Sequence, residues 1–327
     1  MKEADIRNPA TFARYLELVQ EDVNRLFGDQ AHFESVGCPA CGGQNHEPEF
    51  TKVGFRYVTC KDCGTLFANP RPAPEKLKEF YVNSRSSIYW VEEFFLPMVE
   101  ARREKIFRPR AAYVAERLPT LKEEKVGDIG AGFGLFLEEL RSFWPQAAMV
   151  AIEPSAQMAN ICRSKGFEVI QTTIEELPGQ EGGFGLVSAF ELLEHLHEPR
   201  LLLEKACQLL RPGGYFLATT LNGEGFDIQV LWEKSKSVFP PHHLNFFNPR
   251  SLAGLCAAAG LTVEEITTPG QLDWNIVENA LNLDGVGTDR FWQVVARTGS
   301  ETCKQELQSW LSRHGFSSHM RIIARRN

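Results

Sequence analysis

The stretch Val126-Gly127-Asp128-Ile129-Gly130-Ala131-Gly132-Phe133-Gly134 decides the fold. It reads as a buried strand that ends in a glycine turn and opens into a helix over Leu135–Leu140. Open α/β sheets build a cofactor crevice at their carboxyl edge from such a unit. The glycines leave room for a ligand against bare backbone. A tight strand-to-helix connection needs small residues even with nothing bound, so the turn alone leaves both interpretations open.

The glycine spacing separates this turn from the dinucleotide fingerprint. In G-x-G-x-x-G the third glycine comes one residue later than it does in Gly130-x-Gly132-x-Gly134. With Asp128 in front, the pattern resembles the first motif of class I S-adenosylmethionine (SAM) methyltransferases. The resemblance implies that Asp128 and the backbone of the three glycines hold the methionine part of SAM.

A second strand is expected over Ala148–Ile152, and an acidic residue follows it. Glu153 stands 21 residues after Gly132, which is about the interval at which a carboxylate meets ribose hydroxyls. A carboxylate accepts hydrogen bonds from both hydroxyls. We therefore place Glu153 and the adjoining Pro154 in the cofactor site.

A third segment, Thr172–Pro178, follows an expected strand over Phe167–Ile170. It resembles the adenine-contacting segment of the same methyltransferases. The resemblance implies that Ile174 lies against the adenine ring and that Glu175 or a neighbouring backbone group meets its edge. An ordinary turn into the next helix explains the segment equally well.

The fourth expected strand, Phe184–Phe190, runs into Glu191-Leu192-Leu193-Glu194-His195-Leu196. Family members usually have Asp where Gly185 stands, but Glu194-His195-Leu196 matches their pattern. The resemblance implies that Glu191 belongs to the cofactor site and that His195 lies near the methyl donor. A histidine that only bonds backbone at a helix start is the alternative interpretation.

Two Cys-x-x-Cys pairs, Cys38–Cys41 and Cys60–Cys63, are separated by 18 residues, which is the spacing of zinc sites. Glycines at Gly42, Gly43 and Gly64 permit the positive φ angles that follow such knuckles. Four thiolates fill the tetrahedral ion and leave no position for an activated water, so the zinc is structural, one per chain. The expected ligands are Cys38, Cys41, Cys60 and Cys63. A redox role is disfavoured because no thioredoxin-like βαβ unit surrounds either pair.

The run Cys38–Tyr81 resembles the N-terminal zinc ribbon of a large group of bacterial small-molecule methyltransferases, many encoded with surface-sugar or natural-product biosynthesis. The fold class that follows is α/β, a class I (Rossmann-like) seven-stranded sheet with an N-terminal Cys₄ ribbon and a helical linker. Met320–Arg325 is expected to be its antiparallel closing strand. We expect an N-terminal helix in residues 1–35, the ribbon in 36–72, a helical linker and active-site cover in 73–118, and the SAM-binding domain in 119–327.

The loop Pro240–Phe247 resembles the P-x-H-H-x-x-x-F segment of sugar and small-acceptor methyltransferases. Methyl transfer must align an acceptor lone pair and remove one proton. His242 and His243 are the predicted base, because imidazole titrates nearest neutral pH, and we expect the rate to fall as they protonate near the usual pKa of about 6.5. A purely structural role for both remains open.

The charge and hydropathy of the chain limit the kinds of partner that it can bind. A net charge of −7 over 327 residues and a pI of about 5.7 argue against nucleic acid. There is no apolar run of the roughly 20 residues that a membrane span needs, and the N-terminus lacks a secretion signal, so a soluble, cytoplasmic protein is expected. An amphipathic helix over Asn8–Leu26 packs on the protein body or on a sister subunit, which leaves a homodimer open.

Three functions from different classes follow. The leading one is a SAM-dependent methyltransferase acting on a small polar acceptor, sugar-like or a natural-product intermediate, with O-methylation slightly ahead of C-methylation. The second is an RNA base methyltransferase with a zinc ribbon, against which the acidic charge speaks. The third is a non-catalytic zinc-ribbon interaction protein, against which the intact Asp128, Gly130, Gly132 and Glu153 speak.

Overall fold

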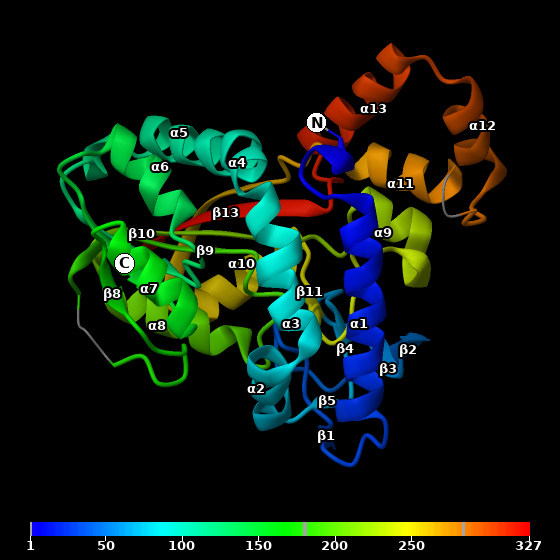
Figure 1. Ribbon diagram of the computed structural model, residues 1–327, viewed down its shortest axis with the longest axis horizontal. Coiled ribbons are helices and arrows are strands. Elements are labelled where there is room, and N and C mark those ends of the chain that lie inside the picture. Colours follow the sequence, from blue (N-terminus) through cyan, green and yellow to red (C-terminus); the bar gives the residue numbers. More distant parts are fainter. Residues whose placement is uncertain (1, 179–181, 283–284) are drawn as a thin grey trace.

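A seven-stranded sheet forms the centre of the protein in the computed structural model, which describes residues 2–178, 182–282 and 285–327 (Figure 1). Its strands, in spatial order, are β12 (Leu261–Thr267), β13 (His319–Arg326), β10 (Leu210–Leu221), β9 (Phe184–Phe190), β6 (Lys125–Ile129), β7 (Ala148–Ile152) and β8 (Glu168–Ile170). Strands β10 to β8 pair in parallel, whereas β13 is antiparallel to both of its neighbours. The predicted fold class, with its antiparallel closing strand, is confirmed.

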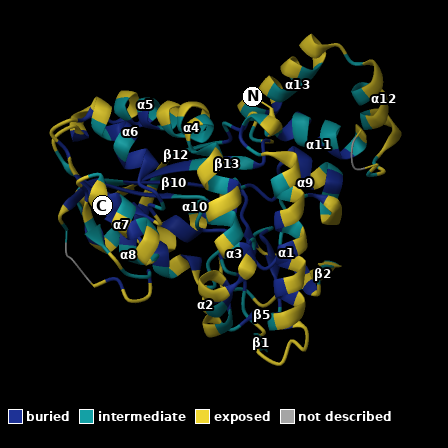
Figure 2. Cartoon of the chain, viewed as in Figure 1, coloured by how far each residue is buried: buried dark blue, intermediate teal, exposed yellow. Residues whose placement is uncertain are grey.

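Helices cover both faces of this sheet. The helices are α5 (Arg108–Arg117), α6 (Leu135–Phe143) and α7 (Ala156–Ser164) on one face, and α8 (Pro199–Leu209) and α10 (Pro249–Ala258) on the other. Alternate residues of β7 point to opposite faces: Val150 and Ile152 join the core under α8 and α10, while Met149 and Ala151 join the core under α5 and α6. The strands are buried throughout most of their length, and the outer helix faces are exposed (Figure 2).

A second, four-stranded antiparallel sheet carries the cysteine pairs. It consists of β2 (His46–Lys52), β3 (Phe55–Cys60), β4 (Leu66–Ala68) and β11 (Asn245–Phe246), and the short β1 (Phe33–Glu34) and β5 (Arg71–Pro72) pair beside it. Strand β11 comes from the loop that carries the two adjacent histidines, so this loop completes the ribbon sheet. The predicted domain boundaries at residues 35, 72 and 118 stay a prediction.

The N-terminal helix α1 (Pro9–Phe27) packs on the ribbon. It begins after Asn8, whose side chain accepts hydrogen bonds from the backbone N–H groups of Ala10 and Thr11, and Pro9 occupies the first turn. Its residues Tyr15, Val19 and Val23 share a buried cluster with Phe55 and Tyr57 of β3.

The linker is helical, as predicted. It comprises α2 (Pro74–Asn83), α3 (Arg85–Tyr89), π-helical segments over Trp90–Phe95 and Arg103–Phe107, and α4 (Val99–Arg102). A separate cluster at the C-terminal end is formed by α9 (Phe226–Leu231), α11 (Asp273–Asn282), α12 (Arg290–Thr298) and α13 (Glu301–Arg313). Within the described ranges, no helix has both the length and the hydropathy to cross a membrane.

Candidate active site and zinc centre

The glycine turn lies between β6 and α6 at the carboxyl edge of the sheet. Gly130, Gly132 and Gly134 have φ angles of +70°, +55° and +67°, a region that residues with a Cβ rarely adopt. A Cβ on Gly134 would lie 3.0 Å from the Sγ atom of Cys162, whereas a Cβ on Gly132 would meet no atom within 4 Å. Gly134 therefore serves packing, and Gly132 borders the open space that a ligand against bare backbone requires.

Two buried carboxyl groups adjoin this turn. Asp128, at the end of β6, accepts a hydrogen bond of 2.7 Å from the hydroxyl of Ser188, and burial raises the pKa of Asp128 to about 7. Glu153, just after β7, accepts hydrogen bonds from the backbone N–H groups of Gly132 (2.8 Å) and Ser155 (2.9 Å). Glu153 thus fixes the turn while its oxygens keep further lone pairs for a ligand.

The other residues predicted to hold the cofactor lie in varied surroundings. Ile174 is buried in the same core cluster as Ile152, while Glu175 and Pro154 are exposed. Glu191 follows β9 with a φ of +50°, and its side chain is 41% exposed. Their roles toward a cofactor stay predictions.

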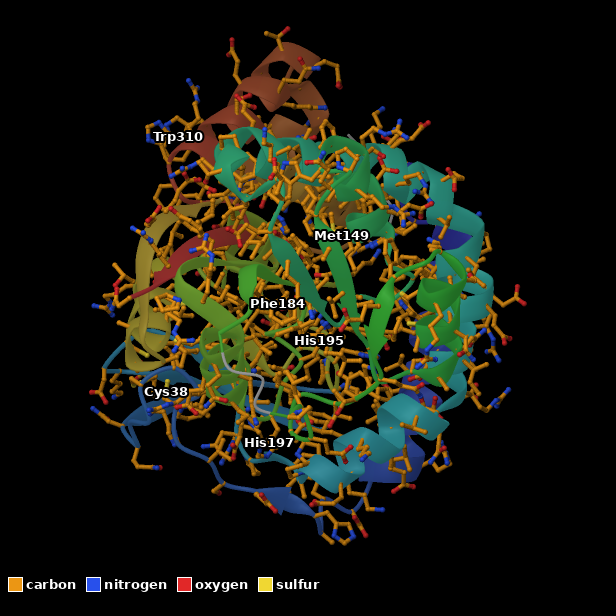
Figure 3. The ribbon with its side chains drawn as sticks, turned by 90° about the vertical axis from the view of Figure 1, so that its left-hand side faces the viewer. Cys38, Met149, Phe184, His195, His197 and Trp310 are labelled. Atoms are coloured by element: carbon orange, nitrogen blue, oxygen red, sulfur yellow. The ribbon has the colours of Figure 1, made fainter. Side chains whose placement is uncertain are left out.

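A cluster of aromatic and titratable side chains forms beside the end of β9. The ring of His195 lies 4.9 Å from the ring of His243 and 6.1 Å from that of His242, centroid to centroid. Figure 3 labels His195 near the middle of the view and Cys38 toward its lower left. The structure therefore brings together the three histidines that were predicted from two separate segments.

Each of these three histidines has a hydrogen-bond partner of a different kind. His243 Nδ1 lies 2.6 Å from the carbonyl oxygen of Ser237, which only accepts, so Nδ1 carries the hydrogen and Nε2 keeps its lone pair. His195 Nδ1 lies 3.3 Å from the Tyr81 hydroxyl, in a hydrogen bond that either partner can donate. His242 Nε2, in contrast, bonds the Tyr15 hydroxyl at 2.8 Å.

Burial changes the titration of all three rings. It lowers the pKa of His242 to about 3 and that of His243 to about 4, and it holds the pKa of His195 well below its usual range, with neighbouring histidines adding to the effect for His242 and His195. This corrects the expectation that the reaction rate falls as these histidines protonate near pH 6.5. The rings are neutral throughout the physiological range, since a charged imidazole would have to lose its hydration.

Two glutamates complete the cluster. Glu194 is buried and accepts a hydrogen bond of 2.7 Å from the Thr220 hydroxyl, and both burial and the charge of Glu191 raise the pKa of Glu194. Burial also acts to raise the pKa of Glu191, but His319 and Arg110 outweigh it and lower that pKa to about 2. Sequence reasoning gave Glu194 no role of its own, although its position next to His195 at a strand end was a usable signal.

A family profile described as "Methyltransferase domain" matches residues 98–266, just over half of the chain. The chain belongs to this methyltransferase family. A ubiquinone biosynthesis O-methyltransferase from Xanthomonas euvesicatoria is 28% identical over 171 residues, covering 48% of this chain and 70% of that protein. One of the same name from Cronobacter sakazakii is 32% identical over 120 residues, covering 35% and 49%.

Solved structures of methyltransferases are also similar. A geranyl diphosphate methyltransferase in complex with SAM is 16% identical with a TM-score of 0.48, covering 70% of this chain and 90% of that one. A SAM-dependent methyltransferase from Archaeoglobus fulgidus is 20% identical with a TM-score of 0.46, covering 71% and 100%. Family membership makes this protein a SAM-dependent methyltransferase, an enzyme with SAM as its methyl donor.

The ribbon of this methyltransferase supports the histidine cluster directly. The Tyr57 hydroxyl of β3 donates to the carbonyl oxygen of His243 at 2.7 Å. Arg71 is fully buried and donates to Asn245 Oδ1 and to the carbonyl oxygen of His197, both at 3.0 Å. These bonds join the ribbon to both loops that carry the histidines.

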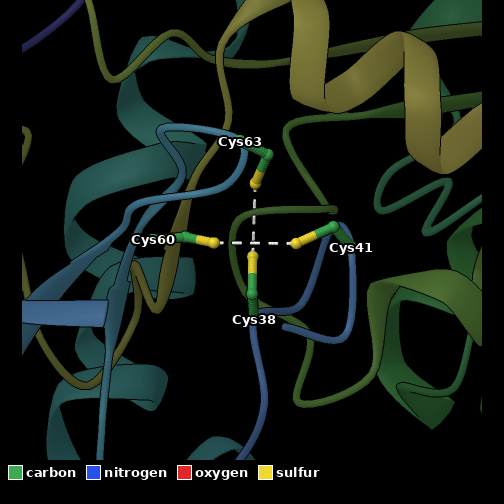
Figure 4. Close-up of side chains that lie close together, drawn as sticks. All are labelled: Cys38, Cys41, Cys60 and Cys63. Carbon is green, nitrogen blue, oxygen red and sulfur yellow. Dashed lines mark hydrogen bonds between the residues drawn. The ribbon is translucent and has the colours of Figure 1, made fainter. Parts of the chain in front are cut away.

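The four predicted zinc ligands converge in the methyltransferase's ribbon (Figure 4). The Sγ atoms of Cys38 and Cys63 lie 3.5 Å apart, those of Cys41 and Cys60 3.6 Å apart, and all four lie within 4.8 Å of one another. Tetrahedral zinc with Zn–S bonds of about 2.3 Å requires S···S separations of about 3.8 Å. Gly42 and Gly64 follow the knuckles with φ angles of +75° and +76°, as expected. The thiol set therefore fits one zinc ion.

Proposed function

We propose that the methyltransferase transfers the methyl group of SAM to a hydroxyl of a small polar acceptor, sugar-like or a natural-product intermediate. The observation that carries this proposal is the contact between the two halves of the site. A Cβ on Gly130 would lie 3.2 Å from the side chain of Leu192, which stands between Glu191 and Glu194. We infer that a donor held at the turn lies next to the histidine and glutamate cluster. The name of the Xanthomonas relative favours oxygen as the acceptor atom.

On this proposal the donor lies along the carboxyl ends of β6 and β7. Asp128 and the glycine backbone hold its methionine part, and Glu153 accepts from its ribose hydroxyls. The proposed adenine contacts are Ile174 and Glu175, and the remaining residues assigned to the donor are Gly130, Gly132, Gly134, Pro154 and Glu191. The open space at Gly132 and the spare lone pairs of Glu153 fit this group.

The bound donor supplies a methyl group on a sulfonium, a leaving group that needs no protonation. The chain's own residues must then align the acceptor oxygen and dispose of its proton. We assign this task to the cluster around His195 and His243, where the Nε2 atom of His243 is free to accept. His242 is tied to Tyr15 and stacks on Phe239 at an interplanar angle of 15°, so we assign it to positioning the loop.

Arg102 favours an acceptor that carries negative charge. Its Nε atom is buried and has no hydrogen-bond partner among the described residues, and burial lowers its pKa to about 10, with the charges of Arg7 and Arg110 acting in the same direction. A buried guanidinium atom without a partner is costly, and a ligand carboxylate or phosphate relieves that cost. We therefore include acidic sugars and carboxylated aromatics in the acceptor class.

A methylation assay with labelled SAM and pairs of hydroxyl acceptors that differ only in a carboxylate tests this function. We expect transfer to oxygen, with a lower KM for the acidic member, and we expect Arg102→Leu to raise only that KM, by about tenfold. Arg85→Leu is the matched control, because Arg85 is 69% exposed on the same linker. Absence of SAM binding, or methylation of RNA in preference to every small acceptor, would overturn the proposal.

We also propose that one structural zinc holds the ribbon through Cys38, Cys41, Cys60 and Cys63. Residues 1–35, 36–72, 73–118 and 119–327 are then the N-terminal helix, the ribbon, the linker and cover, and the SAM-binding domain. Strand β11 and Arg71 join the ribbon to the last of these, so the ribbon acts as a support for the acceptor loops.

A further inference from the structure

We propose that Glu194, His195 and His243 bind a divalent metal ion, separate from the Cys₄ zinc, that activates the acceptor hydroxyl. One ligand atom from each of these residues lies within 4.8 Å of the others. They come from two segments almost 50 residues apart in the chain, so the grouping is a product of the fold. The binding site rests on geometry alone, and its role in catalysis rests on the proposed function.

Both histidines are oriented as metal ligands are. A metal-bound imidazole almost always donates its other ring N–H to a carbonyl or similar acceptor, which fixes the ring and the tautomer. His243 does so through Nδ1 to the carbonyl oxygen of Ser237, and the Tyr81 hydroxyl lies 3.3 Å from His195 Nδ1, where it can accept in the same way. The Nε2 lone pair of His243 is left for an ion, and an ion at this site selects the His195 tautomer that donates to Tyr81 and leaves Nε2 free.

Glu194 supplies the charge that a cation needs. Glu194 is 99% buried and accepts a hydrogen bond from the Thr220 hydroxyl, and Glu191 adds a second carboxylate nearby. Among the described residues, the ion pairs of these two glutamates belong to Glu191, whose Oε1 atom lies 3.6 Å from Arg110 Nη2 and 3.4 Å from His319 Nδ1. Glu194 has no such partner among them, and a divalent ion at the cluster supplies one.

The ligand set selects the kind of ion. Two imidazole nitrogens with one or two carboxylate oxygens suit first-row divalent ions such as Mn²⁺, Fe²⁺ or Zn²⁺, whereas Ca²⁺ and Mg²⁺ prefer oxygen ligands alone. Three protein ligands also leave coordination positions open. The four thiolates of the ribbon form a softer ligand set, the one proposed for structural zinc, so Mn²⁺ is the ion that distinguishes the new site from the ribbon.

An open coordination position gives the metal a role in the transfer. The acceptor hydroxyl binds the ion, its O–H bond breaks, and the proton leaves to water beside the half-exposed Glu191. The oxygen then forms the C–O bond with the methyl carbon as the C–S bond breaks, and the sulfonium becomes a neutral thioether. With the ion bound, His195 and His243 are ligands, and the ion takes over the task of activating the hydroxyl that the proposed function assigns to their cluster.

Titration of the full-length, zinc-containing protein with Mn²⁺, followed by the EPR signal of free Mn²⁺, tests the site. We expect one Mn²⁺ per chain at micromolar affinity, and at least tenfold weaker binding in His243→Gln and in Glu194→Gln. His314→Gln, an exposed histidine after α13, is the control and should bind Mn²⁺ as the parent does. Equal binding in all of these proteins, or no binding to the parent, would overturn the proposal.

Two further measurements keep the result interpretable. Pulsed EPR on the parent with bound Mn²⁺ should show coupling to imidazole nitrogen, which needs no variant, and its absence counts against the site. Activity should fall at least tenfold in a chelator that leaves the ribbon zinc in place and return with Mn²⁺. Undiminished transfer in the chelator removes the metal's role but leaves the proposed function standing. Mn²⁺ bound through imidazole without any methyl transfer supports the site, and that failure belongs to the proposed function.

Discussion

The proposed donor half and the proposed acceptor half of the site are built in opposite ways. The donor half comes from one continuous stretch, residues 126–134, and from Glu153 at the next strand, and backbone N–H groups hold it together. The acceptor half gathers side chains from α1, α2, the segment after β9 and the loop before β11, and the ribbon holds it in place. On this assignment, residues close together in the chain recognise the donor, whereas residues from distant parts of the chain recognise the acceptor.

Loss of the ribbon zinc site should have the largest effect, and it should affect the acceptor half more than the donor half. Cys60→Ser removes one of four thiolates, so we expect zinc to fall from about one per chain to near zero and the free energy of unfolding to fall by at least about 3 kcal/mol. Metal analysis and denaturant unfolding measure both. Cys303→Ser, at an exposed cysteine, is the control.

The same variant tests how far the ribbon supports the acceptor half. Tyr57 and Arg71 anchor the histidine loops from the ribbon, so methyl transfer should be lost under conditions where calorimetry still detects SAM binding to the remaining folded protein. A zinc-free Cys60→Ser protein with parental stability would contradict a structural zinc at this position.

A change in the donor half should have the next largest effect, and it should weaken SAM binding while leaving the acceptor half unchanged. Glu153→Ala removes the acceptor for the ribose hydroxyls, and we expect SAM affinity to fall by about 2–4 kcal/mol, or roughly 30-fold to 1,000-fold. Mn²⁺ binding at the acceptor half should not change. Calorimetry measures the first quantity, with Glu168→Ala, at an exposed glutamate of β8, as the control. If Glu153→Ala binds SAM as tightly as the parent does, Glu153 does not recognise the ribose hydroxyls.

The same contrast explains which features the sequence predicted. The glycine turn and the Cys-x-x-Cys pairs depend on residues a few positions apart, and the structure has these glycine conformations and this thiol cluster. The parallel strands followed from apolar runs between turns.

The acceptor half was only partly predictable. His242 and His243 are neighbours in the chain and received one shared role, but the fold ties His242 to Tyr15, 227 residues away, and turns His243 toward His195. Tyr81 has no local signal, because its contact with His195 spans 114 residues. The pKa values of the histidines could not be predicted from the sequence either, since they depend on burial by segments that are distant in the chain.

The smallest effect should be a pH dependence that belongs to the donor half alone. Asp128 has a folded-state pKa of about 7 against an ordinary value of 3.8, so the ligand-free protein holds a proton there that the unfolded chain releases, and its stability should fall as pH rises from about 4 to 7. The ammonium group of SAM pairs only with the carboxylate, so binding must expel this proton. Between pH 6 and pH 7.5 we expect SAM affinity to rise about eightfold, if binding lowers this pKa well below 6.

Calorimetry in two buffers of different ionisation enthalpy should show the released proton. Asp128→Asn should bind SAM with a flat profile over this range, and a variant that keeps the parental slope would place the titrating group elsewhere. Because burial holds the histidine pKa values far below this window, a slope there that disappears with Asp128→Asn would assign the pH dependence to the donor half.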